Sequence, residues 1–212
     1  MSRKARAMPR DHQFAPMAER VAALNTRYDH HGATAVLEHA LRDRDVGRVA
    51  LVSSFGAESV VLLHLLSVIS PHTPVLFIDT QMLFAETLAY QQELAQKLYL
   101  TDIRRLSPSP ASLAMGDPDG TLHQYDTDAC CALRKTDVLE AALSGFDAWI
   151  TGRKRYQSGT RADVEFFEAD GDARLKINPL AHWGRDDLEE YMINNRLPRH
   201  PLVAQGYPSI GC

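Results

Sequence analysis

The feature that most constrains the fold is an alternation of short apolar runs with stretches of helical periodicity. Residues 49–52 are apolar and rich in valine, which is typical of a buried strand. A turn of small residues leads from them into the apolar stretch 60–66, which indicates a buried helix, and residues 74–80 predict a second strand. A strand, a helix and another strand in this order favour a parallel sheet with helical crossovers. The sequence therefore predicts an α/β fold.

Periodicity and turn residues predict the remaining elements in the same way. We expect helices at 15–28, 34–44, 84–98, 130–143 and 186–194, strands at 100–106 and 148–151, and a hairpin of 164–167 with 175–177. Residues 107–120 carry three prolines and predict a loop. A chain of 212 residues, 45% of them hydrophobic, has room for one full core. We therefore expect a single domain at 15–212, preceded by a disordered basic tail at 1–14.

Charge and hydropathy exclude several classes of function. The net charge of −4 argues against bulk nucleic-acid binding. No apolar run approaches the roughly 20 residues that a membrane-spanning helix needs, so we expect no membrane partner. The basic start has no apolar stretch behind it, which disfavours a secretory signal. With three cysteines and no export signal, we expect a cytoplasmic protein whose cysteines are ligands or nucleophiles rather than disulfides.

The cysteines are the first candidates for chemistry. Cys130 and Cys131 are adjacent, and Cys212 is the last residue of the chain. The helical pattern after the doublet places it at or near a helix N-terminus, where amide groups and the helix dipole favour thiolates. Adjacent cysteines are poorly placed to form a disulfide with each other, and are better suited to one multinuclear metal centre. On spacing alone the alternative of inert core cysteines stays open.

Two loops are candidate anion sites. The turn at 53–59 contains serines and a glycine between a predicted strand and a predicted helix, an arrangement that directs N–H groups and hydroxyls at a phosphate or sulfate. It has neither the Gly-Lys-Ser/Thr of a Walker loop nor the Rossmann glycine triplet. The loop at 152–161 carries four cations directly after a predicted strand, which favours anion binding over a merely solvated basic loop.

Six motifs occur in a fixed order along residues 49–212. They are Ser-Ser-Phe-Gly-Ala-Glu at 53–58, Ile-Asp-Thr at 78–80, Cys-Cys-Ala-Leu-Arg-Lys at 130–135, Thr-Gly at 151–152 with Gln-Ser-Gly-Thr-Arg at 157–161, Asn-Pro-Leu at 178–180, and Gly-Tyr-Pro-Ser-Ile-Gly-Cys at 206–212. With these motifs the chain resembles the assimilatory adenylyl-sulfate and phosphoadenylyl-sulfate reductases. The resemblance implies a mainly parallel sheet flanked by helices, of the adenine-nucleotide α-hydrolase or PP-loop type.

The resemblance also implies a [4Fe–4S] cluster. In this family a Cys-Cys doublet with a distant Cys-x-x-Cys marks the iron–sulfur branch, which usually takes adenylyl sulfate. Cys130, Cys131 and Cys212 match three of the four thiolate ligands that such a cluster needs. We expect the native protein to continue past Cys212, with the fourth ligand three residues on and the nucleophilic cysteine in a C-terminal tail.

The implied reaction converts adenylyl sulfate and reduced thioredoxin, or glutaredoxin, to sulfite, AMP and the oxidised donor. The tail cysteine attacks the sulfate sulfur, and the donor thiol then releases sulfite from the enzyme. Lys135 is the candidate for electrostatic catalysis. The candidate substrate-binding residues are Ser53, Ser54, Phe55, Gly56, Glu58, Ile78, Gly152, Arg155 and Arg161. Arg153 and Lys154 replace a Gln and an Arg that the family usually has, so positive charge is retained.

Three alternatives accompany this interpretation. The first is a phosphoadenylyl-sulfate reductase that has kept a cluster, and the second is a non-catalytic nucleotide- or cluster-binding protein, if the gene ends at Cys212. The third, an ATP-pyrophosphatase relative, is disfavoured because the turn at 53–59 lacks the Ser-Gly-Gly-x-Asp-Ser loop of those enzymes. The electron donor and the oligomeric state stay open, and a homo-oligomer is compatible with the sequence.

Overall fold

The computed structural model describes residues 14–157, 162–207 and 210. Within these ranges six strands form one sheet in the order β3-β2-β1-β4-β6-β5. The strands are β1 (Val49–Ser53), β2 (Val75–Ile78), β3 (Ile103–Leu106), β4 (Ala148–Ile150), β5 (Phe167–Asp170) and β6 (Arg174–Ile177). Every neighbouring pair is parallel except β5 with β6, which is antiparallel. The predicted mainly parallel α/β sheet is therefore confirmed.

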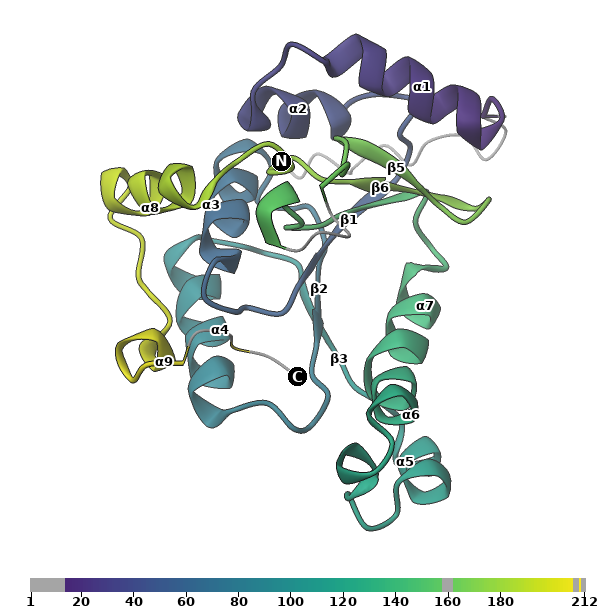
Figure 1. Ribbon diagram of the computed structural model, residues 1–212, viewed down its shortest axis with the longest axis vertical. Coiled ribbons are helices and arrows are strands. Elements are labelled where there is room, and N and C mark those ends of the chain that lie inside the picture. The colour runs from purple at the N-terminus through teal and green to yellow at the C-terminus, as the bar shows by residue number, and fades with distance from the viewer. Residues whose placement is uncertain (1–13, 158–161, 208–209, 211–212) are drawn as a thin grey trace, which may run out of the picture.

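The helices connect these strands and surround the sheet (Figure 1). The α-helices of the described ranges are α1 (Met17–Tyr28), α2 (Ala33–Ala40), α3 (Ser59–Ile69), α4 (Ala85–Lys97), α5 (Pro110–Gly116), α6 (Thr127–Cys131), α7 (Asp137–Leu143), α8 (Arg185–Asn194) and α9 (Pro201–Ala204). Two 3₁₀ turns, η1 (Leu122–Gln124) and η3 (Arg155–Gln157), and one π turn, η2 (Ala132–Thr136), complete the set. No described helix is long and apolar enough to cross a bilayer.

Both faces of the central strands are covered, which explains their uninterrupted apolar sequence. Leu51 and Phe77 point into the larger core, with side chains from α1 to α4 and α8. Ala50 and Leu76, the alternate residues of the same strands, pack with Leu143 of α7 on the opposite face. Figure 1 shows α3 and α4 on one side of the sheet and α7 on the other. Strands buried on both faces need apolar residues at successive positions rather than at every second one.

Two short helices begin with a proline, and the first of them lies where the sequence predicted a loop. In α5 the hydroxyl of Ser109 accepts a hydrogen bond from the Ser112 amide at 3.0 Å, and Pro110 occupies the first turn. In α9 the cap is His200 and the first residue is Pro201. A proline in the first turn loses no helical hydrogen bond and has the right φ. Pro110 therefore marks a helix start, and the loop prediction was wrong at Pro110–Gly116.

The helix predicted at 130–143 begins earlier and is not uniform. A carboxylate oxygen of Asp126 accepts a hydrogen bond from the Ala129 amide at 2.9 Å, so α6 starts at Thr127. The Cys130 amide already donates to the Asp126 carbonyl at 3.0 Å, so the doublet follows the helix start rather than forming it. After Cys131 the helix widens into the π turn η2 before α7.

Two further boundaries differ from the prediction. The first strand of the hairpin, β5, starts at residue 167 instead of 164. Strand β3 starts at 103 instead of 100. The predicted basic tail falls almost wholly outside the described residues.

Candidate functional site

A cavity of about 640 Å³ opens at the carboxyl ends of β1 and β4. These strands are adjacent in the sheet, but β1 continues through α3 to β2 on one side while β4 neighbours β6 on the other. Such a reversal of strand order leaves a crevice that binds ligands in open α/β sheets. The polar and charged residues that line the cavity are Ser53, Ser54, Glu58, Ser59, Lys135, Thr151, Arg153, Lys154, Tyr156, Gln157 and Arg185; Gly56, Gly152 and Ile210 line it with backbone or apolar atoms.

The turn after β1 is held in an unusual backbone conformation. Phe55 has a φ of 52°, which non-glycine residues adopt rarely. Its amide donates to the Ser53 hydroxyl at 3.1 Å, and its fully buried ring packs edge-on against Phe77 with centroids 5.1 Å apart. The next residue, Gly56, approaches the chain end so closely that a Cβ there would lie 2.8 Å from the Ile210 carbonyl oxygen. Phe55 therefore anchors the turn while its neighbours face the cavity.

Glu58 caps this turn and joins it to the loop after β4. Its carboxylate accepts hydrogen bonds from the Lys154 ammonium at 2.5 Å and the Tyr156 hydroxyl at 2.8 Å. Burial alone would raise the pKa of Glu58, but the hydrogen bond and charge of Lys154, aided by Tyr156, hold it below its ordinary value. Burial and the same carboxylate raise the pKa of the Tyr156 phenol. Lys154, only 3% exposed, thus faces an ionised carboxylate in the cavity wall.

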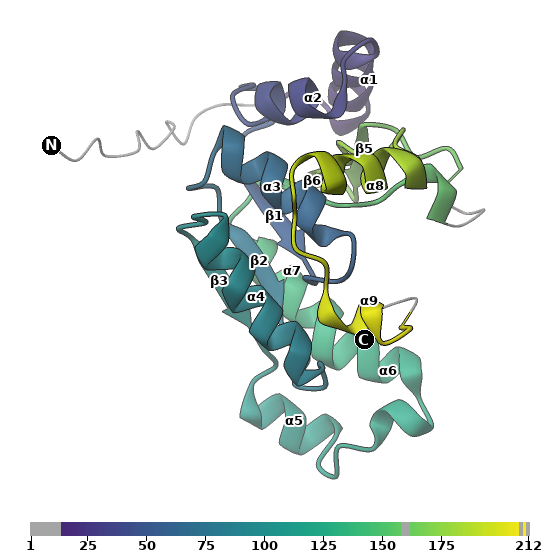
Figure 2. The ribbon, with the colours of Figure 1, turned by 90° about the vertical axis from the view of Figure 1, so that its left-hand side faces the viewer.

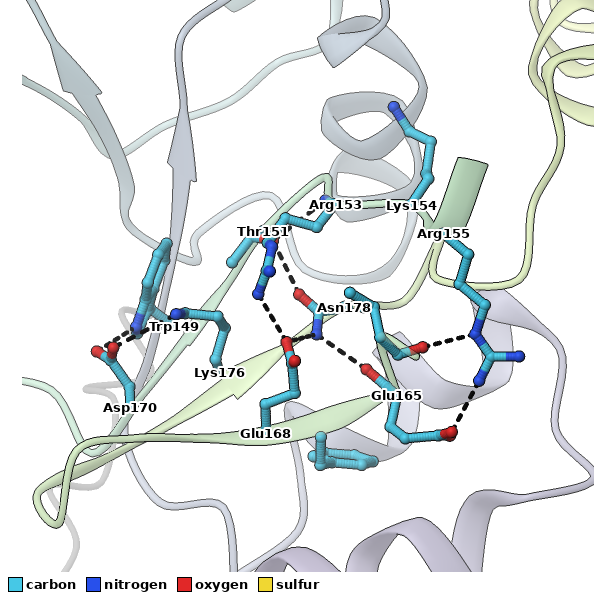
Figure 3. Close-up of polar contacts among 12 residues, drawn as sticks. Trp149, Thr151, Arg153, Lys154, Arg155, Glu165, Glu168, Asp170, Lys176 and Asn178 are labelled. Carbon is cyan, nitrogen blue, oxygen red and sulfur yellow. Dashed lines mark hydrogen bonds and ion pairs between the residues drawn. The ribbon is translucent and has the colours of Figure 1, made fainter. Parts of the chain in front are cut away.

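The three consecutive cations after β4 point in different directions (Figure 3). Arg153 donates to Glu168 at 2.8 Å, while Arg155 donates to Glu165 at 2.8 Å and does not line the cavity. Lys154 points to Glu58 as described. Each cation thus has a carboxylate partner. In the described part of the basic loop, these ion pairs therefore serve first to fix the conformation of the loop.

A buried network sets the path of that loop. The Thr151 hydroxyl donates to Asn178 Oδ1 at 2.9 Å and accepts from the Arg153 amide at 3.1 Å. The amide group of Asn178, which has no exposed surface, donates to Glu168 at 2.6 Å. Figure 3 shows this chain of contacts linking β4, β5 and the segment after β6. Buried and satisfied networks of this kind are rigid, so Gly152 is held at the end of β4.

The π turn separates two neighbouring cations. Arg134 is 5% exposed and turns inward, donating to Asp117 Oδ2 at 2.6 Å and to the Thr80 carbonyl at 2.9 Å. The hydrogen bonds of Arg134 and of the Leu122 amide lower the pKa of the Asp117 carboxyl. Lys135 is exposed on the cavity, and no carboxylate of the described ranges forms an ion pair with it. π turns often occur at functional sites, and this one leaves Lys135 available for a ligand anion.

The cysteine doublet lies directly before this turn in the chain. Cys130 is 3% exposed and Cys131 is exposed, whereas Cys212 lies outside the described residues. Within those residues no three His, Cys, Asp or Glu side chains gather as a metal site. Two adjacent thiols are soft donors of the kind that iron–sulfur centres use. Ile210 lines the same cavity as Lys135, so the chain two residues before Cys212 returns to this region.

The structure brings together most of the residues predicted from sequence. Those that line the cavity are Ser53, Ser54, Gly56, Glu58, Gly152 and Lys135, those that do not are Phe55, Ile78 and Arg155, and Arg161 lies outside the described residues. Sequence reasoning missed Tyr156 and Arg185, whose guanidinium lies 5.6 Å from the Tyr156 ring centroid. No local sequence signal marks Arg185, because it enters the site through the packing of α8.

This combination defines a class of protein: an open α/β sheet with a polar, lysine-bearing ligand cavity at its switch point. The chain belongs to the phosphoadenosine phosphosulfate reductase domain family, whose model matches residues 48–212. The resemblance stated from the motifs is thereby confirmed.

Similar proteins agree with this family and with the fold. An adenosine 5′-phosphosulfate reductase of Mesorhizobium japonicum is 46% identical over 196 residues, covering 92% of this chain and 77% of the relative. A Candida auris phosphoadenylyl-sulfate reductase, crystallised with phosphate, superimposes with a TM-score of 0.78 at 24% identity, covering 94% and 97% of the two chains. A Candida glabrata FMN adenylyltransferase reaches 0.59 at 15% identity, covering 92% and 72%. The two structures show the fold alone, and they confirm the predicted α/β architecture of a mainly parallel sheet flanked by helices.

Proposed function

We propose that this protein reduces adenylyl sulfate to sulfite and AMP in sulfate assimilation. The observation that carries the proposal is the convergence of three elements on one cavity: the turn after β1, Lys135 and the returning chain at Ile210. The relatives named adenosine 5′-phosphosulfate reductase, 46% identical over most of the chain, support the same substrate. We extend the proposal to a cytoplasmic location and to thioredoxin or glutaredoxin as the electron donor.

The cavity residues would bind the substrate and stabilise the leaving group. Ser53 and Ser54 present hydroxyls and the turn presents amides, which suit phosphate and sulfate oxygens. Lys135 would neutralise charge on the phosphosulfate as AMP departs. Glu58 is committed to Lys154, so it would shape the cavity rather than exchange protons. Arg161 stays in the proposal as a second sulfate ligand on its motif alone.

The electron balance is that of a thiol-dependent reduction. A cysteine thiolate of the predicted C-terminal tail attacks sulfur, so a sulfur–sulfur bond forms and the sulfur–oxygen bond to AMP breaks with its electron pair leaving on AMP. One donor thiolate then attacks the enzyme cysteine sulfur, so that a mixed disulfide forms and sulfite leaves. The second donor thiolate attacks the donor sulfur of that bond, so that the donor disulfide forms and the enzyme thiolate is released. Two thiols thus become one disulfide and supply the two electrons.

We further propose that Cys130, Cys131 and Cys212 hold a [4Fe–4S] cluster with a fourth cysteine of the predicted tail. When bound, the cluster would supply a local electrostatic field rather than electrons, since the electrons come from thiols. Full-length protein purified without oxygen should be brown and contain about four irons per chain. Cys130→Ser and Cys131→Ser should each lose iron and colour while still binding AMP by calorimetry. A colourless, iron-free and active wild type would contradict the assignment.

Substrate preference distinguishes an adenylyl-sulfate reductase from a phosphoadenylyl-sulfate reductase. The cysteine doublet and the relatives favour the nucleotide without a 3′-phosphate. We expect kcat/KM for adenylyl sulfate to exceed that for the 3′-phosphorylated nucleotide by tenfold or more, which is about 1.4 kcal/mol in transition-state binding. The reverse preference would identify a phosphoadenylyl-sulfate reductase that carries a cluster.

A further inference from the structure

The chain returns to the cavity through a segment that rests on α4. We call residues 198–207 together with Ile210 the C-terminal strap. Figure 2 shows its helix α9 beside α4, and the two helices are in contact. Leu202 of α9 is 2% exposed, and its carbonyl accepts a hydrogen bond from the Tyr207 amide at 3.1 Å. Ile210 is three residues beyond Tyr207, and three residues of chain span at most about 11 Å. The position of α9 therefore restricts where Ile210 can lie.

One buried histidine fastens this strap to α4. His200 is 1% exposed, and its Nδ1 accepts a hydrogen bond from the Leu202 amide at 3.2 Å. Its Nε2 lies 3.1 Å from the hydroxyl of Thr87, which is also buried. The ring of Tyr90 packs edge-on against it at 4.8 Å, and the Tyr90 hydroxyl donates to the Pro198 carbonyl at 2.8 Å. Every one of these contacts joins the strap to α4 or caps α9.

The hydrogen bonds determine the form of the imidazole. Because Nδ1 accepts from a backbone amide, the proton of the neutral ring resides on Nε2, which donates to the Thr87 hydroxyl. Protonation of Nδ1 would place two donors against each other. Burial lowers the pKa of His200, and the carboxylate of Glu86 on α4 opposes this only in part. The neighbouring Arg199 is paired with Glu189 of α8.

We propose that neutral His200 is a positioning residue that locks the C-terminal strap to α4 and so holds Ile210 against Gly56 at the cavity. The contact of the Ile210 carbonyl with Gly56 leaves no room for a side chain, so a small displacement of α9 changes the cavity wall. The proposal rests on the proposed nucleotide site only for one of its three readouts, the affinity for AMP.

Hydrogen exchange of the full-length protein tests the lock directly. Thr87→Val removes the acceptor on α4, and His200→Asn keeps a capping oxygen for α9 but cannot reach Thr87. We expect exchange of the amides at 198–207 to accelerate about fivefold in each variant, the factor for one net hydrogen bond of about 1 kcal/mol. Thr101→Val is the matched control, because it removes a threonine–histidine hydrogen bond with His72 away from the strap.

Two further readouts separate positioning from general stability. The AMP dissociation constant should rise by about the same fivefold factor in both variants. In the wild type, strap exchange corrected for its intrinsic pH dependence should accelerate as the pH falls below about 6.5, the ordinary histidine value. The neutral form is favoured in the fold, so its contribution is complete above that pH and is lost as the pH falls through the lowered pKa. His200→Asn should show no such acceleration.

Three results would overturn the proposal. The first is that amide exchange in the strap is unchanged in both variants. The second is that amide exchange in the peptides of α3 accelerates as much as exchange in the strap. The third is that the pH profile of strap exchange is the same in wild type and His200→Asn. If the wild type fails to bind AMP, the proposed function is wrong, while strap exchange still decides the role of His200.

Discussion

Replacement of Phe55 distinguishes a ligand contact from a packing anchor. The motif suggested that Phe55 binds substrate, yet its ring is fully buried against Phe77. Truncation of a buried Phe to Ala costs about 3–5 kcal/mol. Phe55→Leu keeps most of the apolar volume and loses chiefly the aromatic pair, about 0.5–1.5 kcal/mol, with a further repacking cost below about 1.5 kcal/mol. We therefore expect losses of about 4 and about 1–2 kcal/mol in the free energy of unfolding.

Urea denaturation followed by circular dichroism measures these losses. With a slope of about 2 kcal/mol per molar urea, the midpoint should fall by about 2 M for Phe55→Ala and by less than about 1 M for Phe55→Leu. Phe77→Leu is the matched control, because it removes the other ring of the pair from β2. The double variant should show a coupling energy of about 0.5–1.5 kcal/mol.

AMP binding provides the opposing test. If Phe55 acts through packing, Phe55→Leu should bind AMP within about threefold of wild type, or about 0.6 kcal/mol. An affinity tenfold weaker, with a urea midpoint unchanged from wild type, would show that the ring contacts the nucleotide and refute the anchoring role.

Two further predictions concern charges of the cavity. Lys135→Ala should lower kcat/KM for adenylyl sulfate by about 100-fold, the usual effect of losing one stabilising donor. The affinity for AMP should change little. Lys97 is an exposed lysine at the end of α4, and Lys97→Ala should leave both quantities unchanged. The pKa of Glu58 is below its ordinary value, so its stabilising effect is complete above about pH 4.5. The urea midpoint of wild type should therefore exceed that of Glu58→Gln by a constant amount from pH 7 to about 4.5, and should approach it as the pH falls below about 4.5. A difference that stays constant below about pH 4.5 would show that the Lys154 ion pair does not stabilise the fold.

The strands and the order of the helices could be predicted because their signals are local. Continuous apolar runs and the small-residue turn at 53–59 are visible within a few residues, and parallel packing on both faces explains why they do not alternate. Pro110 was misread for a physical reason: like Pro201, it suits either a loop or the first turn of a helix. Only the capping side chains Ser109 and His200, seen in place, decide between the two.

The site was harder to predict because charge pairing is decided by tertiary contacts. The run from Arg153 to Arg155 suggested anion binding, but each of these cations meets a carboxylate from elsewhere in the chain. Nothing in the sequence near Lys154 reveals that its partner is Glu58, 96 residues away. Likewise, nothing in the sequence near Arg134 reveals that its partner is Asp117, which turns it inward while Lys135 faces the cavity.

The strand order has a consequence for how the protein is made. β1 lies in the middle of the finished sheet, and its neighbour β4 is reached only after about a hundred further residues, as the contact of Arg48 with Asp147 across 99 positions shows. At a synthesis rate of about 5–20 residues per second, β1 therefore remains an unpaired sheet edge in the nascent chain for roughly 5–20 s. Exposed apolar edges are templates for aggregation. The strand that carries the ligand turn is thus open to aggregation in the growing polypeptide until β4 has been made.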